Sequence, residues 1–92
     1  MLREDGFVLD DGTTARLGEN HYLMTTTTAA AGLVMRHLDF VHQAFCADWK
    51  LRFISVTEGW AQFAIAGPQA RALVNSFLEV PADLPFMAVC PV

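Results

Sequence analysis

Two adjacent carboxylates, Asp10 and Asp11, stand where a short apolar run ends and a polar segment begins. Phe7-Val8-Leu9 precedes them and Gly12-Thr13-Thr14 follows. A strand that leaves a packed sheet at the rim of a pocket has this apolar-then-acidic order, and a carboxylate at such a rim can act as a general acid or base. The same residues also suit a hairpin turn, because Asp-Gly is a strong turn signal. The spacing alone leaves both interpretations open.

A run of four threonines, Thr25 to Thr28, is the second concentration of polar groups. Their branched side chains favour an extended backbone, and either of the last two can cap a helix. The cysteines and histidines lack the spacing of a metal site. Two free thiols and no metal are therefore expected, in a reducing cytoplasm.

Composition limits the possible functions. The chain has 92 residues, which predicts one domain, and its net charge of -4 comes with six scattered Lys and Arg residues. The lack of a basic stripe argues against nucleic acid or an anionic membrane as a partner. No apolar run approaches the roughly 20 residues of a membrane span, and the N-terminus lacks the apolar core of a signal peptide. Because 53% of the residues are hydrophobic, some apolar surface is expected to need a partner.

The first half of the chain predicts a three-stranded meander followed by a helix. The expected strands are 6–10, 14–17 and 21–25, with turns at Asp11-Gly12 and at 18–20. The expected helix runs from Ala29 to Phe45, because its apolar residues recur at helical spacing. These are Val34, Leu38, Val41 and Phe45.

The second half predicts two strands, a helix and the beginning of a further strand. The strands are 51–57 and 60–66, and Gly67-Pro68 opens the helix because proline suits the first helical position. Residues 84–90 resemble a strand whose partner is missing. The order predicts an α+β fold, a mostly antiparallel sheet with two helices on one face, related to ferredoxin-like and split β-α-β layouts.

Four stretches together are similar to a known family: 6–17, 21–28, 55–68 and 84–87. They resemble the alpha subunits of heterotetrameric sarcosine oxidases. More broadly, they resemble the folate-binding aminomethyltransferase fold of the glycine cleavage T-protein. The Asp-Asp-Gly-Thr-Thr and Thr-Thr-Thr-Thr runs point to the sarcosine oxidase branch. The resemblance implies that residues 1–92 are a partial folate-binding aminomethyltransferase-like domain, a fragment of a longer chain.

The resemblance implies an oxidoreductase that demethylates sarcosine. In that family sarcosine is oxidised at a flavin carried on another subunit, and the methylene iminium of glycine then reaches the alpha subunit. There tetrahydrofolate captures the one-carbon unit as 5,10-methylenetetrahydrofolate, whereas water would release formaldehyde. The implied partners are folate and the beta, gamma and delta subunits, with flavin and NAD bound elsewhere in the assembly.

The resemblance also assigns site residues. It implies that Asp11 lies beside the reactive nitrogens of the pterin as the catalytic acid–base group, and that the backbone of Thr25 and the side chain of Thr27 hold the pterin edge. Thr27 stands where the family has an asparagine, so it offers one hydroxyl in place of an amide. The fragment alone is expected neither to turn over nor to bind folate tightly.

Two alternatives remain open. The chain could belong to a non-catalytic folate-binding or subunit-assembly module of the same fold, in which Asp10 and Asp11 form a turn. It could also be a small ligand-binding α+β domain complete in itself.

Overall fold

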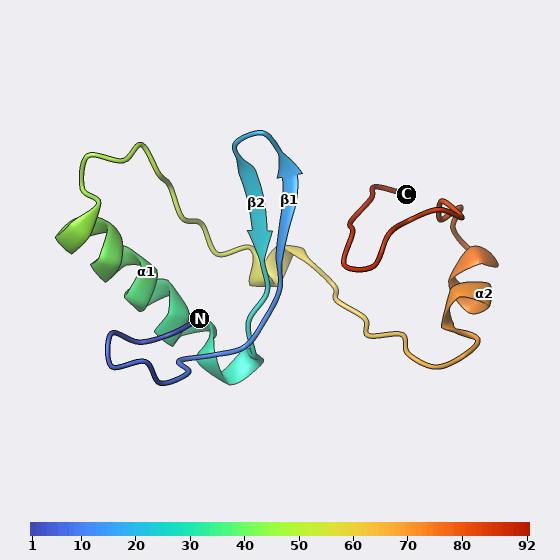
Figure 1. Ribbon diagram of the computed structural model, residues 1–92, viewed down its shortest axis with the longest axis horizontal. Coiled ribbons are helices and arrows are strands. Elements are labelled where there is room, and N and C mark those ends of the chain that lie inside the picture. Colours follow the sequence, from blue (N-terminus) through green and yellow to red (C-terminus); the bar gives the residue numbers. More distant parts are fainter.

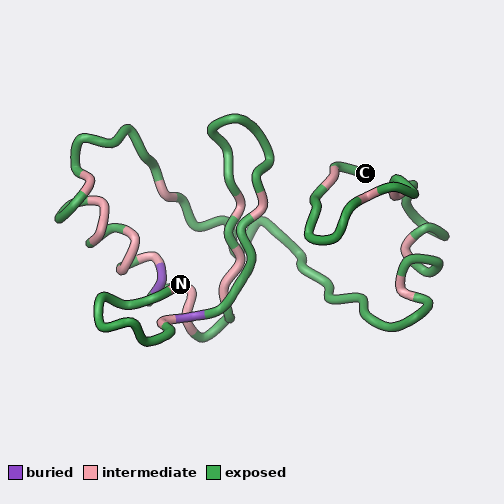
Figure 2. The backbone as a smooth tube through the Cα atoms, viewed as in Figure 1, coloured by how far each residue is buried: buried purple, intermediate pink, exposed green.

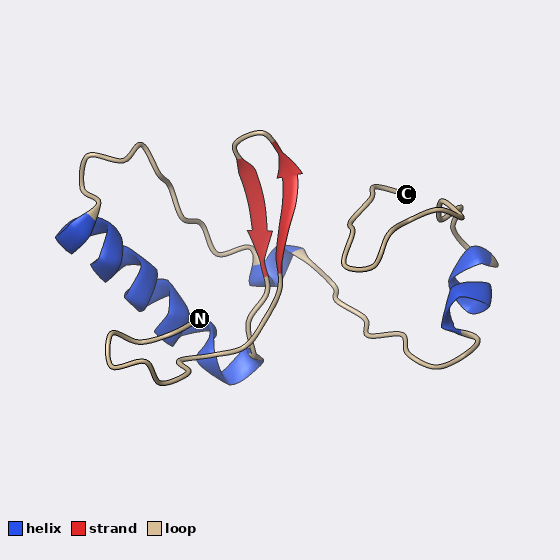
Figure 3. Cartoon of the chain, in the orientation of Figure 1, coloured by secondary structure: helices blue, strands red, loops and turns tan.

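The computed structural model describes residues 1–92 and contains one hairpin and a small number of helices (Figure 1). The strands are β1 (Thr14–Gly18) and β2 (His21–Met24), and the α-helices are α1 (Ala31–Phe45) and α2 (Ala70–Asn75). Two short 3-10 helices, η1 (Thr28–Ala30) and η2 (Thr57–Gly59), complete the regular structure. The antiparallel pair and the helices confirm the predicted α+β class (Figure 3).

The β1–β2 hairpin forms as predicted, with the chain reversing at residues 19–20. Thr14 lies opposite Met24, and the register shifts between Arg16 and Gly18. The Arg16 guanidinium satisfies the turn, since it donates to the carbonyls of Gly18 and Glu19 at 3.1 and 3.0 Å.

The predicted first strand, 6–10, and the predicted turn at Asp11-Gly12 are both wrong. Residues 1–9 fold back on themselves and contribute one isolated bridge, between Leu2 and Val8. Residues 11–13 continue into β1 without a turn. The reason is that Asp10 and Thr13 bond to the threonine run, which holds the chain extended between them.

Helix α1 confirms the predicted helix, with a 3-10 turn in place of its first residues. Val34 is its one fully buried side chain, 2% exposed. At the other end the Cys46 N–H bonds to the His42 carbonyl, and the His42 ring lies 2.9 Å from the Trp49 carbonyl oxygen. The expected threonine cap is absent, because the Thr27 hydroxyl bonds elsewhere.

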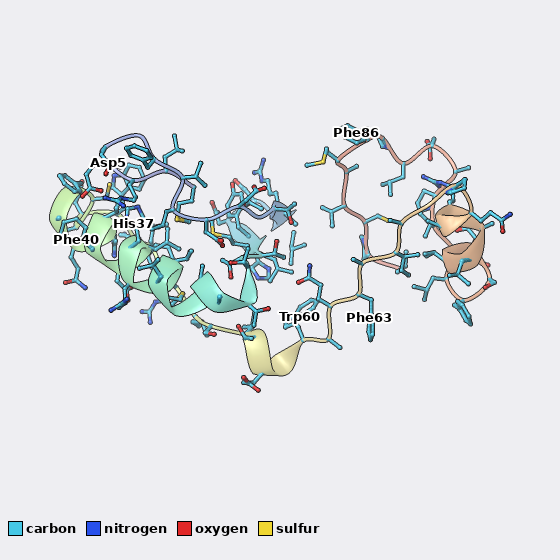
Figure 4. All side chains as sticks on the ribbon, turned by 90° about the horizontal axis from the view of Figure 1, so that it is seen from below. Asp5, His37, Phe40, Trp60, Phe63 and Phe86 are labelled. Carbon is cyan, nitrogen blue, oxygen red and sulfur yellow. The ribbon has the colours of Figure 1, made fainter.

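The predicted strands at 51–57, 60–66 and 84–90 are not formed. Each contains residues that favour strands, but a strand needs a partner for its backbone groups, and none of the three pairs with another segment. Trp60, Phe63 and Phe86 are therefore highly exposed (Figure 4). Helix α2 forms where the proline predicted a helix, although it begins two residues after Pro68.

The chain is open in shape. Its radius of gyration is 16.1 Å, whereas a compact domain of this length has about 12 Å. Its accessible surface is 8211 Å², against about 5,300 Å² for a folded protein of this mass. Only two residues, Val34 and Asp10, are buried (Figure 2). So little buried area offsets only a small part of the entropy cost of ordering the chain. None of the helices has the length and apolar character needed to cross a membrane.

Candidate functional site

Asp10 is the one buried polar residue, 9% exposed, and its carboxylate is bonded on both oxygens to the threonine run. One oxygen accepts the Thr27 N–H at 2.8 Å, and the other accepts the Thr27 hydroxyl at 2.7 Å. We call this double contact the Asp10–Thr27 clamp. It fastens the segment before β1 to the start of η1, seventeen residues later.

The clamp fixes the protonation state of Asp10. The Thr27 hydroxyl, followed by the Thr27 N–H, holds the pKa of Asp10 below its ordinary value, and partial desolvation acts in the opposite direction. Both bonds are donated to the charged form, which is why they favour it. Asp10 is therefore a carboxylate at neutral pH, with both oxygens engaged.

A second contact joins the same two segments, at Thr13 and Thr25. The Thr25 N–H donates to the Thr13 carbonyl at 2.8 Å, and the Thr13 N–H donates to the Thr25 hydroxyl oxygen at 3.0 Å. Gly12 lies against the same residue, since a Cβ built on it would be 2.0 Å from the Thr25 carbonyl oxygen. Only glycine permits this approach.

Asp11 lies between these two fixed points and points outward. Its side chain is exposed, and its one hydrogen bond in the chain is accepted from the Gly12 N–H at 2.9 Å. The rest of the carboxylate is free to meet a ligand. Because successive side chains of extended backbone alternate, Asp10 inside and Asp11 outside follow from a single chain direction.

The three residues predicted for the site are linked through the neighbours of Asp11, and they differ in how free they are to bind. Asp10 bonds to Thr27 on one side of Asp11, and Gly12 lies against Thr25 on the other. The N–H and the hydroxyl hydrogen of Thr27 are given to Asp10, so Thr27 can offer a ligand only the lone pairs of its oxygen. Sequence reasoning treated Asp10 only as the neighbour of Asp11. The signal it missed was the hydroxyl-rich run, which supplies the donors that a buried carboxylate needs.

The edge formed by Asp11 and the threonine run is open to solvent and does not border either of two surface hollows elsewhere on the chain. One hollow, of about 470 Å³, lies between residues 65–69 and the start of α2. The other, of about 450 Å³, lies between the N-terminal loop and α1. Neither is lined by Asp11, Thr25 or Thr27. Asp11 and the threonine run therefore form one side of a binding site, and a ligand at Asp11 would be open to solvent on its other side.

The fold and this edge define an α+β domain whose candidate site is a carboxylate projecting from a clamped segment beside a threonine run. A family model described as the GCVT N-terminal domain matches residues 1–92. The chain belongs to the GCVT N-terminal domain family, which confirms the predicted relationship.

Curated relatives fall in two groups. Sarcosine oxidase subunit alpha of Rhizobium meliloti (strain 1021) is 50% identical over 96% of this chain, and that of Corynebacterium sp. (strain U-96) is 39% identical over 96%. An aminomethyltransferase of Thermus thermophilus is 34% identical over 87%. The chain spans 9% and 10% of the two alpha subunits and 22% of the aminomethyltransferase. No solved structure matches the chain.

Proposed function

We propose that this chain is part of the folate-handling domain of a sarcosine oxidase alpha subunit, where it helps tetrahydrofolate capture the one-carbon unit released from sarcosine. The 50% identity to one such subunit supports the choice of protein. The observation that carries the chemistry is the position of Asp11, exposed and unshared except with Gly12, between two points where the chain is fastened to the threonine run.

The reaction needs a group that moves protons. A folate nitrogen attacks the methylene carbon of the iminium, a second folate nitrogen closes the ring, and the bond from that carbon to the glycine nitrogen breaks. The two protons lost by the folate nitrogens end on the glycine nitrogen, so no net proton is released. Asp11 as the carboxylate accepts a proton in the first step, returns it to the leaving amine, and stabilises the cationic species between.

The threonines supply acceptors for the pterin edge in this proposal. The Thr25 carbonyl lies beside Gly12 and accepts no hydrogen bond from the surrounding loops. The Thr27 oxygen keeps lone pairs while its hydrogen is held by Asp10. A pterin presents amino and ring N–H donors, which such acceptors can hold. Thr27 would thus act only as an acceptor, unlike the amide that the family has there.

The remaining parts of the assignment concern the whole protein. We propose that the chain represents a partial domain of a longer subunit, that beta, gamma and delta subunits complete the enzyme, and that flavin and NAD are bound outside these residues. A cytoplasmic location belongs to the same proposal.

The test uses a chimaera of the Rhizobium meliloti alpha subunit, in which this chain replaces the matching 91 residues, assembled with its partner subunits. Sarcosine oxidation is followed by oxygen uptake, and capture by the ratio of 5,10-methylenetetrahydrofolate to formaldehyde. Asp11→Ala should leave oxidation intact and abolish capture. Asp48→Asn, which changes an exposed carboxylate without hydrogen bonds, is the matched control.

A second candidate is a non-catalytic module for folate binding or subunit assembly. The many exposed aromatic and aliphatic side chains favour it, because they offer a surface for other polypeptide. Capture that persists in Asp11→Ala would select this candidate and reject the first.

A further inference from the structure

Asp10 has no part in the chemistry assigned to Asp11, yet it is the most firmly bonded side chain near it. We propose that Asp10 is a positioning residue that fixes, through Thr27, the place from which Asp11 acts on folate. This inference rests on the proposed function and adds a role for a residue to which that function assigns none.

The geometry leaves Asp11 little freedom. The residue before it is held by the Asp10–Thr27 clamp, and the two after it are held against Thr25. Each peptide unit is planar and separates consecutive Cα atoms by about 3.8 Å. A residue whose neighbours are fastened on both sides can therefore move only by small rotations. Loss of either fastening would free one side of Asp11.

The clamp has two parts that substitutions can separate. Asp10→Ala removes both acceptors and leaves the Thr27 N–H without a partner. In Asp10→Asn the amide oxygen can accept the N–H, and the amide NH2 can donate to the hydroxyl, which rotates to accept. Asp10→Asn therefore keeps both bonds to Thr27 but loses the charge, and Asp10→Ala loses both bonds. Thr27→Val removes one bond, and Thr27→Ser keeps both.

The experiment measures kcat and KM for folate capture in the assembled chimaera. Asp10→Ala should lower capture about 10- to 100-fold, since small misplacements of a catalytic group cost this much. Thr27→Val should lower kcat about 5- to 10-fold, the equivalent of its hydrogen bond to Asp10, and loss of the oxygen proposed for the pterin edge should appear in KM. Asp10→Asn and Thr27→Ser should stay within about threefold, and Asp48→Asn should be unchanged. The loss should fall on kcat more than on KM, because a displaced base slows the step even with folate bound.

The outcomes separate this inference from the function on which it rests. Capture within twofold of the parent in Asp10→Ala, while Asp11→Ala abolishes it, would overturn the positioning role and leave the proposed function standing. Unchanged capture in Asp11→Ala would remove both. If Asp10→Ala prevents folding, seen as a parallel loss of sarcosine oxidation, Thr27→Val decides. It removes both the bond to Asp10 and the oxygen proposed for the pterin edge. A fall in kcat at saturating folate supports the inference, whereas a rise in KM with kcat unchanged rejects it.

Discussion

The Thr27 hydroxyl lies 2.7 Å from one carboxylate oxygen of Asp10 and the Thr27 N–H lies 2.8 Å from the other, so a single threonine satisfies a buried aspartate. The two residues come from separate segments, one before the hairpin and one after it. Their contact closes the base of the hairpin and decides which of two adjacent aspartates faces out.

Gly12→Ala should open the hairpin base. The added Cβ would lie 2.0 Å from the Thr25 carbonyl oxygen, which is backbone and cannot rotate away. We expect a loss of about 1–3 kcal/mol in local stability, as for other forced overpacking. Hydrogen exchange of peptides covering 10–28 in the chimaera measures it.

The matched control is Gly32→Ala in α1, where an added Cβ meets nothing within 4 Å. Because alanine favours helices over glycine, this change should stabilise α1 by about 0.5–1 kcal/mol. Equal effects of the two substitutions would contradict the close approach at Gly12.

Acid should release the clamp. The pKa of Asp10 is lower in the folded chain than its ordinary value of 3.8, so the unfolded state binds the proton more readily. The stabilisation is therefore complete above the ordinary value and is lost as the pH falls through the lowered pKa. Protection of the Thr27 amide, corrected for intrinsic exchange, should be constant from pH 7 to about 5 and then fall in stronger acid.

Asp10→Asn supplies the reference for this titration, because its amide does not ionise. Its protection should show no acid-dependent loss beyond that of the rest of the hairpin. If the unsubstituted chimaera and its Asp10→Asn variant lost protection identically in acid, the loss would belong to another titratable group.

Val34→Ala should weaken the packing of α1. Val34 is the one buried hydrophobic side chain, and its truncation removes two methyl groups from contact. We expect a cost of about 1.5–3 kcal/mol in the opening of α1, measured by hydrogen exchange. Val89→Ala, at a side chain 48% exposed, should change stability by less than about 0.5 kcal/mol.

The isolated chain should not bind tetrahydrofolate tightly. Asp11 is exposed, and it lines neither the hollow beside α2 nor the hollow beside α1. Titration with tetrahydrofolate, followed by NMR of the labelled chain, should give weak, unsaturated shifts. Strong saturable shifts centred on Asp11 and Thr25 would show that these residues form a sufficient site and would refute this prediction.

The elements that the sequence determined by itself are those stabilised by near neighbours. The hairpin of β1 and β2 closes across two turn residues, and α1 follows from the helical spacing of Val34, Leu38 and Val41. Such contacts need little loop closure, so local pattern suffices to predict them. The same local pattern predicted strands at 51–57 and 60–66, which are not formed because strand propensity has no effect without a partner.

Only the tertiary structure decided the roles of the two aspartates. In the sequence Asp10 and Asp11 are equivalent neighbours, and Asp-Gly favours a turn. In the structure the chain stays extended, because the Thr27 N–H and hydroxyl bond to the carboxylate of Asp10 and Gly12 packs against the Thr25 backbone. A hydrogen bond that joins residues seventeen positions apart leaves no periodic trace in the sequence, and it is this bond that turns one aspartate inward and leaves the other facing solvent.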